Sequence, residues 1–312
     1  MAQIITRRKT QAAEQEQLMK SSKTAKYSAW VALFGFVLAT LFPIWFMVRT
    51  AFSTTRSLPA DPLSLLPVDF TLGAFNRVLG LASTADAVAE GGSGQSLDFI
   101  QYFSNSVIAT TGATLSQTVF SAMAAYAFGV LRWRGRDAIF FIFLFALTVP
   151  AIFLVLPNFL LVRELGLVGT LLGVMAPNLL MAPFSVFFLR QVFLGTNMSI
   201  VEAAIIDGAS HFRIFWRIVL PMAQAQVLTV FILQYITIWN DYLWPFYIGG
   251  SNEESKTLTV ALGVFRSQTP QGSPDWAGLM AGSLVAAVPM LLLMIFLGRK
   301  IVGSIQNSGV KG

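Results

Sequence analysis

The chain has 312 residues, of which 55% are hydrophobic and 12% charged, with a mean hydropathy of +0.67 and a formal net charge of +6. This balance excludes an ordinary soluble domain and predicts an integral membrane protein. The basic residues occur in short groups between apolar segments, so nucleic acid is not an expected partner. The chain contains no cysteine, which excludes disulfides, thiolate metal sites and cysteine nucleophiles.

The chain opens with a polar, basic stretch, and we expect residues 1–28 to form a cytoplasmic tail. The first transmembrane helix is predicted within 29–51, because 30–48 is apolar and long enough to cross a bilayer. Its bulky end differs from the small-residue cleavage site of a signal peptide. Residues 52–100 contain prolines and a Gly/Ser-rich patch, which predicts an extracytoplasmic loop with some local structure.

Five more apolar spans follow, so the predicted fold is an all-α integral membrane protein with about six transmembrane helices. Residues 101–300 form the predicted five-helix core, and 301–312 a cytoplasmic C-terminal tail. An even number of spans places both termini on the same side of the membrane. Lys and Arg concentrate in the segments on that side, which predicts that both termini are cytoplasmic. The five expected spans are 102–131, 138–162, 167–189, 222–248 and 278–297.

Between the fourth and fifth spans lies a charged, amphipathic stretch, 199–221, within a predicted cytoplasmic loop at 196–221. Ser199 followed by Glu202 has the S-x-x-E form of a capping box and predicts a helix start. Gly208 is suited to a left-handed turn that ends this helix and lets a second one begin near Ser210. In the second helix, Phe212, Phe215 and Trp216 are predicted to share one exposed face, which requires a protein partner.

The sequence lacks the residues of several chemistries. It has no Gly-Lys pair and therefore no phosphate-binding P-loop, so the chain cannot hydrolyse ATP as a P-loop enzyme. His211 is the only histidine and lies in the predicted cytoplasmic loop, so neither a histidine metal cluster nor a Ser-His-Asp triad can form in the membrane. We therefore expect no enzyme, no catalytic residue, and no metal or other cofactor in this chain.

One polar face remains within the fifth predicted span. Gln234, Thr237 and Asp241 recur at helical spacing, with Trp239 and Asn240 beside them. Amide, carboxyl and aromatic groups of this kind can bind a hydroxyl-rich solute along a transport pathway. Two structural interpretations stay open: Asp241 as an anchor in an aromatic interface belt, and the polar side chains as hydrogen-bonding groups between helices.

Glu202-Ala203-Ala204, Gly208, and the Ile218, Leu220 and Pro221 that follow match the EAA-x3-G-x9-I-x-L-P signature of ABC importer permeases. Residues 207–209 and 239–245 resemble the carbohydrate-uptake, maltose-type branch, and the C-terminal tail is similar to the end of its MalG subunit. The resemblance covers about 102–312 and is weaker over the N-terminal tail and the 52–100 loop.

The resemblance implies a type I ABC importer permease fold and a set of partners. These are a second, MalF-like permease subunit, two ATP-binding cassette ATPase subunits that bind ATP and Mg, an extracytoplasmic sugar-binding protein, and membrane lipid. It implies the cytoplasmic (inner) membrane of a bacterium or archaeon. It also implies that the EAA loop is a coupling helix seated in the ATPase, with Glu202 capping the helix, pairing with a basic ATPase group, or both. The coupling residues are then Glu202, Ala203, Ala204, Asp207, Gly208, His211, Phe212 and Phe215. By the same resemblance the C-terminal tail reaches between the ATPase subunits, and the alternative is a frayed chain end. The tail residues are Gly309, Val310, Lys311 and Gly312.

By the same resemblance the cargo is a sugar such as maltose, maltodextrin, trehalose or a related oligosaccharide, moved by alternating access. A competing hypothesis is a self-contained secondary carrier or channel for a small polar solute, based on Asp241 and the number of spans. Transport by the chain alone under an ion gradient separates the two.

Overall fold

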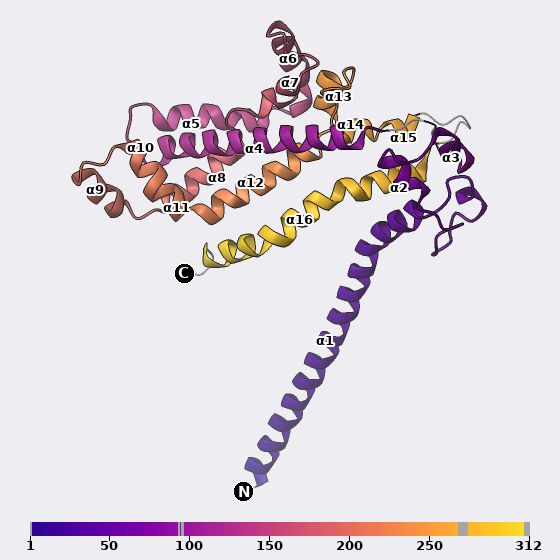
Figure 1. Ribbon diagram of the computed structural model, residues 1–312. Helices are drawn as coiled ribbons and strands as arrows, with labels where there is room; N and C mark the ends of the chain where they lie inside the picture. Colours follow the sequence, from indigo (N-terminus) through magenta and orange to yellow (C-terminus); the bar gives the residue numbers. More distant parts are fainter. Residues whose placement is uncertain (1, 93, 95–96, 268–273, 309–312) are drawn as a thin grey trace.

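The computed structural model describes residues 2–92, 94, 97–267 and 274–308, with the backbone alone at 2–24, 264, 267 and 299–308. Within these residues the fold is helical, and the β-structure is an isolated antiparallel bridge between Ser53 and Phe70. Figure 1 shows α4, α5, α8 and α12 side by side, with α16 crossing toward α1 and α1 extending away from the bundle. The N-terminal half comprises α1 (Ala2–Ala51), η1 (Leu58–Ala60), α2 (Gly73–Val78), α3 (Thr84–Ala89), α4 (Phe99–Gly129), α5 (Arg136–Phe145), η2 (Ala146–Thr148) and α6 (Ala151–Glu164).

In the second half, most helices are short and separated by breaks, and the long α16 follows them. A π-helical turn, η4, lies just before Pro221, where a proline removes a backbone donor from the helix. These elements are α7 (Leu171–Met175), η3 (Ala176–Asn178), α8 (Pro183–Leu194), α9 (Met198–Ile206), α10 (His211–Ile214), η4 (Phe215–Val219), α11 (Leu220–Met222), α12 (Gln224–Trp239), α13 (Leu243–Gly249), α14 (Leu258–Ala261), α15 (Val264–Ser267) and α16 (Trp276–Ser308).

By length and composition, two described helices, 25–51 and 276–298, can each cross a membrane, and the number rises to five if each of three bent helix pairs is one span. The bends are 102° between 136–148 and 151–164, 46° between 171–178 and 183–194, and 83° between 211–222 and 224–239. The predicted spans at 138–162 and 222–248 are therefore interrupted in the structure rather than formed by one continuous helix each. Val149 is extended before Pro150, and Ala223 and residues 240–242 interrupt the other span.

α4 is the central helix of the bundle and packs mainly against α8 and α12. Its 31 residues are rich in small and polar side chains, and it is not among the five apolar segments. The polar side chains are nevertheless buried, so this side of the helix faces neighbouring helices. The buried polar residues of α4 are Asn105, Ser106, Thr110, Thr114, Gln117, Thr118 and Ser121.

A buried ionic cluster joins four segments at the end of the molecule that carries α2 and α3 (Figure 1). The Arg77 guanidinium donates to both oxygens of Asp275, from Nε at 3.0 Å and from Nη2 at 3.1 Å, and contacts Glu90 at 2.7 Å. The Thr55 hydroxyl donates to Asp275 at 2.7 Å. Asp275 also accepts from the Gly278 N–H at 2.8 Å and so caps α16. We call these residues the α1–α16 clamp. Nothing in the sequence pattern predicted it.

The loop after α13 is fastened to the start of α4. Asn105 Nδ2 donates to the carbonyl oxygens of Glu254 and Lys256, both at 2.9 Å. Tyr102 and Lys256 each donate to the Glu253 carboxylate. The hydrogen bond from Lys256, followed by that from Tyr102, lowers the pKa of Glu253, because both favour the ionised form. This loop is therefore held by backbone contacts as well as by charge.

Candidate functional site

α9 and α10 form a helix–turn–helix that protrudes at one end of the molecule (Figure 1). The turn is a Schellman motif, in which the Gly208 N–H donates to Ile205 at 3.0 Å and the Ala209 N–H donates to Ala204 at 2.9 Å. Gly208 has a φ of +80°, so the predicted left-handed conformation is confirmed. Apart from its own chain neighbours, no atom of the described residues lies within 4 Å of where a Cβ would stand, so the glycine is needed for its backbone angle and not for space.

The start of α9 differs from the prediction. Asn197 caps the helix, because its Oδ1 accepts from the Ser199 N–H at 3.2 Å and from the Ser199 hydroxyl at 2.8 Å. α9 begins one residue before Ser199, so the predicted capping box is wrong. Glu202 is exposed and forms no hydrogen bond or ion pair with any residue that the structure describes. α10 begins at His211, next to Ser210, which confirms the predicted start, and Ser210 caps it by accepting from the Arg213 N–H at 3.4 Å.

The three aromatic residues of α10 and η4 do not share one exposed face. Phe212 is 66% exposed and Trp216 is 37% exposed, but Phe215 is only 3% exposed. The Phe215 ring packs on Tyr126 of α4 at a centroid distance of 5.4 Å, and the Tyr126 hydroxyl lies 3.3 Å from His211 Nδ1. The exposure predicted for Phe215 is therefore wrong, because this side of the helix packs against α4 in the core. Phe215 and His211 attach the loop to the bundle.

The outward surface of α9 and α10, which we call the coupling face, combines apolar and acidic side chains. Ala204 is buried against the bundle, whereas the preceding residue, Ala203, is exposed. An apolar surface of this kind on a rigid, capped element is typical of a docking site. The exposed members of the face are Glu202, Ala203, Ile205, Ile206, Asp207 and Phe212.

The predicted polar face of the fifth span is not one face. α12 ends at Trp239, so Asp241 lies in the break before α13 and cannot continue the helical row. Gln234 donates to the Ser185 hydroxyl of α8 at 2.8 Å. For this residue the structure therefore agrees with the alternative interpretation, hydrogen bonding between helices. Thr237 and Asn240 are exposed and donate to carbonyl oxygens of their own helix at 2.9 and 2.8 Å.

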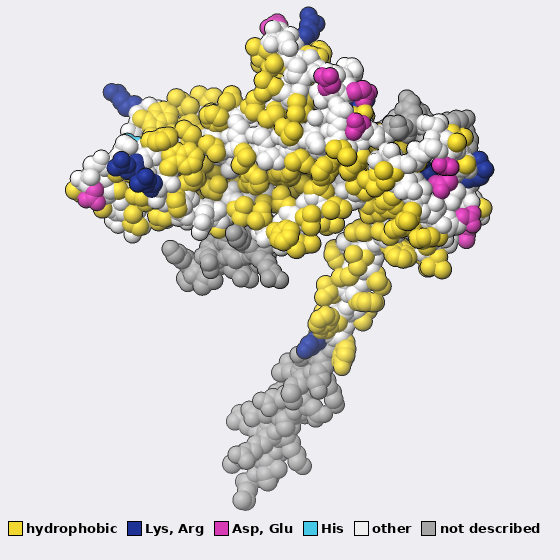
Figure 2. All heavy atoms as spheres, in the orientation of Figure 1, with side chains coloured by type: hydrophobic (Ala, Val, Ile, Leu, Met, Phe, Trp, Pro, Cys, Tyr) yellow, Lys and Arg dark blue, Asp and Glu magenta, His cyan; other side chains and the backbone are white. Residues whose placement is uncertain are grey.

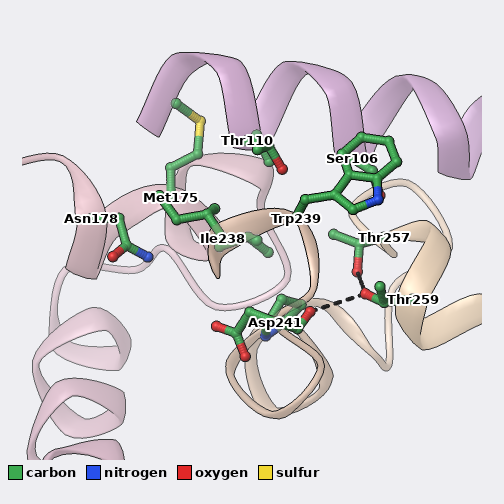
Figure 3. A pocket seen from close by; sticks show the side chains of 12 residues that line it. Ser106, Thr110, Met175, Asn178, Ile238, Trp239, Asp241, Thr257 and Thr259 are labelled. Atoms are coloured by element: carbon green, nitrogen blue, oxygen red, sulfur yellow. Dashed lines mark hydrogen bonds between the residues drawn. The ribbon is translucent and has the colours of Figure 1, made fainter. Parts of the chain in front are cut away.

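Trp239 and Asp241 instead line a small polar cavity, shown in Figure 3. The Trp239 indole N–H donates to the Ala286 carbonyl of α16 at 3.1 Å. Asp241 accepts from the Trp244 N–H at 3.4 Å through its carboxylate and from the Thr259 hydroxyl at 3.0 Å through its carbonyl. Figure 3 shows the carboxylate directed away from Thr259. The cavity measures about 10 Å³, which is room for one water molecule.

Several residues around Asp241 had no signal in the sequence, because they come from separate segments. Asn178 of η3 lines both the small cavity and a wider hollow of about 320 Å³ beside α6 and α13, as Asp241 does. A separate groove of about 980 Å³ lies between α12 and α16 and includes Trp239 and Asn240. The missed polar residues of the small cavity are Ser106, Thr110, Asn178, Thr257 and Thr259. The predicted tail contacts, Gly309 to Gly312, lie outside the described residues.

Figure 2 shows apolar side chains over the middle of the bundle and over the adjoining part of α1, with charged side chains toward the ends. A helical bundle with apolar segments long enough to cross a membrane is typical of an integral membrane protein. Residues 117–303 match the family described as "Binding-protein-dependent transport system inner membrane component". The chain belongs to this family, in its carbohydrate-uptake branch, and is a transport subunit rather than an enzyme.

Characterised relatives cover nearly the whole chain. The arabinooligosaccharides transport system permease protein AraQ of Halalkalibacterium halodurans is 31% identical over 93% of this chain and 99% of its own length. The lactose transport system permease protein LacG of Rhizobium radiobacter is 28% identical over 86% of this chain and 90% of its own. A solved bacterial ABC transporter involved in alginate import has a chain with a TM-score of 0.74 at 24% identity, covering 89% of this chain and 97% of that one. This likeness confirms the type I importer permease fold.

Proposed function

We propose that this chain forms one half of the translocation pathway of an ATP-driven sugar importer and transmits the motion of its ATPases to that pathway. The observation that carries the proposal is the coupling face. Its two helices, α9 and α10, are each capped at their start, and Phe215 anchors them to α4. The expected partners are a MalF-like permease, two ATPase subunits that bind ATP and Mg, and an extracytoplasmic sugar-binding protein. ATPase closure moves such a rigid element without bond chemistry in this chain.

We infer that the coupling face and both termini are cytoplasmic. α1 ends and α16 begins at the α1–α16 clamp, so both termini extend away from that same end of the molecule (Figure 1). This arrangement supports an even number of crossings. The tail contact of Gly309 to Gly312 with the ATPases remains part of the proposal.

We infer that the cargo is an oligosaccharide. Related permeases are named for arabinooligosaccharides and lactose, and the alginate transporter shares the fold. The groove between α12 and α16 supports this class, because it presents Trp239 and Tyr242 beside Asn240 and Thr259. Aromatic faces and amide or hydroxyl groups are the contacts that a sugar uses. Maltose, maltodextrin and trehalose remain candidates within the class.

This function is tested by measuring sugar uptake into proteoliposomes that contain the complete importer, with its binding protein added. Uptake is expected to require ATP, the partner subunits and a sugar that the binding protein recognises. The isolated chain is expected to hydrolyse no ATP. Transport by the chain alone under an ion gradient would show a secondary carrier instead.

Phe212→Ala and Phe215→Ala are expected to fail in different ways. Phe212 is exposed, so its removal weakens ATPase binding while the permease remains folded. Phe215 is buried, so its removal lowers the free energy of unfolding by about 3–5 kcal/mol. Co-purification of the ATPase and thermal unfolding of the permease pair measure the two effects. Equal loss of stability in both variants contradicts this division of roles.

Asp241→Asn is expected to change the dependence of uptake on the sugar offered, with normal abundance in the membrane. The reason is that Asp241 lines the 320 Å³ hollow as well as the small cavity, where a carboxylate can accept from sugar hydroxyls. Competition uptake assays with a panel of oligosaccharides measure the change. An unchanged order of preference favours the interpretation of Asp241 as a structural anchor of α13.

A further inference from the structure

The loop that joins α4 to α5, residues 130–135, carries more positive charge than its neighbours neutralise. Arg136 and Arg190 share one carboxylate, that of Asp137, at 3.3 and 2.9 Å. Arg132 and Arg134 are exposed, and neither has a hydrogen bond or ion pair with a residue that the structure describes. Two guanidinium groups therefore share the carboxylate of Asp137, and the two exposed ones, Arg132 and Arg134, have no carboxylate of their own among the described residues.

A hollow of about 410 Å³ opens beside these charges. Trp133 forms part of its wall and is held in place, because its indole N–H donates to the Ala127 carbonyl at 3.0 Å and its ring packs on Phe128 at 5.8 Å. A fixed tryptophan next to exposed arginines is typical of the boundary between hydrocarbon and headgroups. The hollow is lined by Arg132, Trp133, Gly135, Arg136, Asp137 and Ala138.

An apolar stripe begins at this hollow and continues along α5. Ile139, Ile142 and Phe145 recur every three residues, and each is at least half exposed. Side chains at this spacing lie on one side of a helix. The surface is therefore basic and hollowed at one end and apolar along its length. It is complementary to an anionic phospholipid, which has a negative headgroup and apolar acyl chains.

We propose that the α4–α5 loop is a binding site for an anionic phospholipid. Arg132, in the wall of the hollow, and the exposed Arg134 two residues further on contact the headgroup phosphate, and Trp133 lies at the glycerol level. The acyl chains follow Ile139 and Ile142. Arg190 lies over the Phe140 ring at 4.1 Å and donates to the Phe128 carbonyl at 3.0 Å, so it fixes the relative positions of α4, α5 and α8 and does not move to the lipid. The site is separate from the coupling face.

The test uses the complete importer in phosphatidylcholine nanodiscs that contain a trace of spin-labelled phosphatidylglycerol or spin-labelled phosphatidylcholine. The wild type is expected to immobilise the anionic label preferentially. In the double variant Arg132→Gln/Arg134→Gln, the relative association constant of the anionic label is expected to fall roughly 30-fold, which corresponds to about 1 kcal/mol for each arginine. Arg163→Gln is the control, because Arg163 is an exposed arginine at the end of an apolar helix, α6.

Loss of preference in the double variant with retention in the control supports the site. An unchanged preference in the double variant overturns it, and so does an equal loss in the Arg163→Gln control. Inorganic phosphate is added as a competitor, and displacement of the labelled lipid by phosphate shows a site for a soluble anion and also overturns the proposal. Thermal unfolding of the double variant confirms that the complex is intact before the lipid measurement.

Discussion

Gly208→Val is expected to reduce sugar uptake by the reconstituted importer roughly tenfold or more, while the protein remains in the membrane at normal abundance. Gly208 adopts a φ of +80°, and a left-handed conformation costs an L-residue about 1–2 kcal/mol, with more for a β-branched side chain. The bundle does not depend on this position, because no atom lies within 4 Å of a Cβ there. The strain therefore changes the angle between α9 and α10, which we propose the ATPase engages. Uptake and stimulation of ATP hydrolysis measure the effect.

Gly208→Asn is the matched control, because asparagine tolerates the left-handed region better than other residues with a Cβ. It is expected to retain most of the uptake. A second control, Gly195→Ala, changes a helix-end glycine whose φ is −80° and is expected to be neutral. If Gly208→Val supports uptake and ATPase stimulation at wild-type levels, the turn has no role in coupling.

Arg77→Met is expected to lower the free energy of unfolding by about 3–5 kcal/mol, since it removes the guanidinium from a buried carboxylate. The side chains of Arg77 and Asp275 are 1% and 0% exposed, and the distance between Nε and Oδ2 is 3.0 Å. The clamp ties the end of α1 and the 52–98 loop to the start of α16, so we expect this end to open first. The apparent Tm of the purified permease pair and limited proteolysis within 52–98 measure the loss.

Two further variants separate charge burial from packing. Glu90→Gln is expected to have a smaller effect, because the Glu90 side chain is 29% exposed and water replaces part of the lost contact. The double variant Arg77→Met/Asp275→Leu is expected to recover part of the stability, because no buried charge then remains. An Arg77→Met variant as stable as Glu90→Gln would falsify the clamp as a stabilising feature.

Features that depend on neighbouring residues were predictable from the sequence. The apolar composition indicated a membrane protein, and Gly208 indicated the left-handed turn, because hydropathy and φ preferences are local properties. The EAA spacing indicated the permease family, which the comparisons confirm. One local prediction was wrong: Asn197 and Ser199 are both good caps, and spacing to Glu202 favoured the wrong one.

The tertiary structure decided the positions that depend on contacts between distant segments. Phe215 is buried because it packs onto Tyr126 of α4, and periodicity alone does not show which side of a helix meets a distant segment. Asp241 left the predicted helical face because α12 ends at Trp239. Arg77 and Asp275 are 198 residues apart, so only folding brings their charges together. The sequence by itself therefore determined the membrane class, the family and the glycine turn, whereas packing decided which side chains are buried and which are exposed.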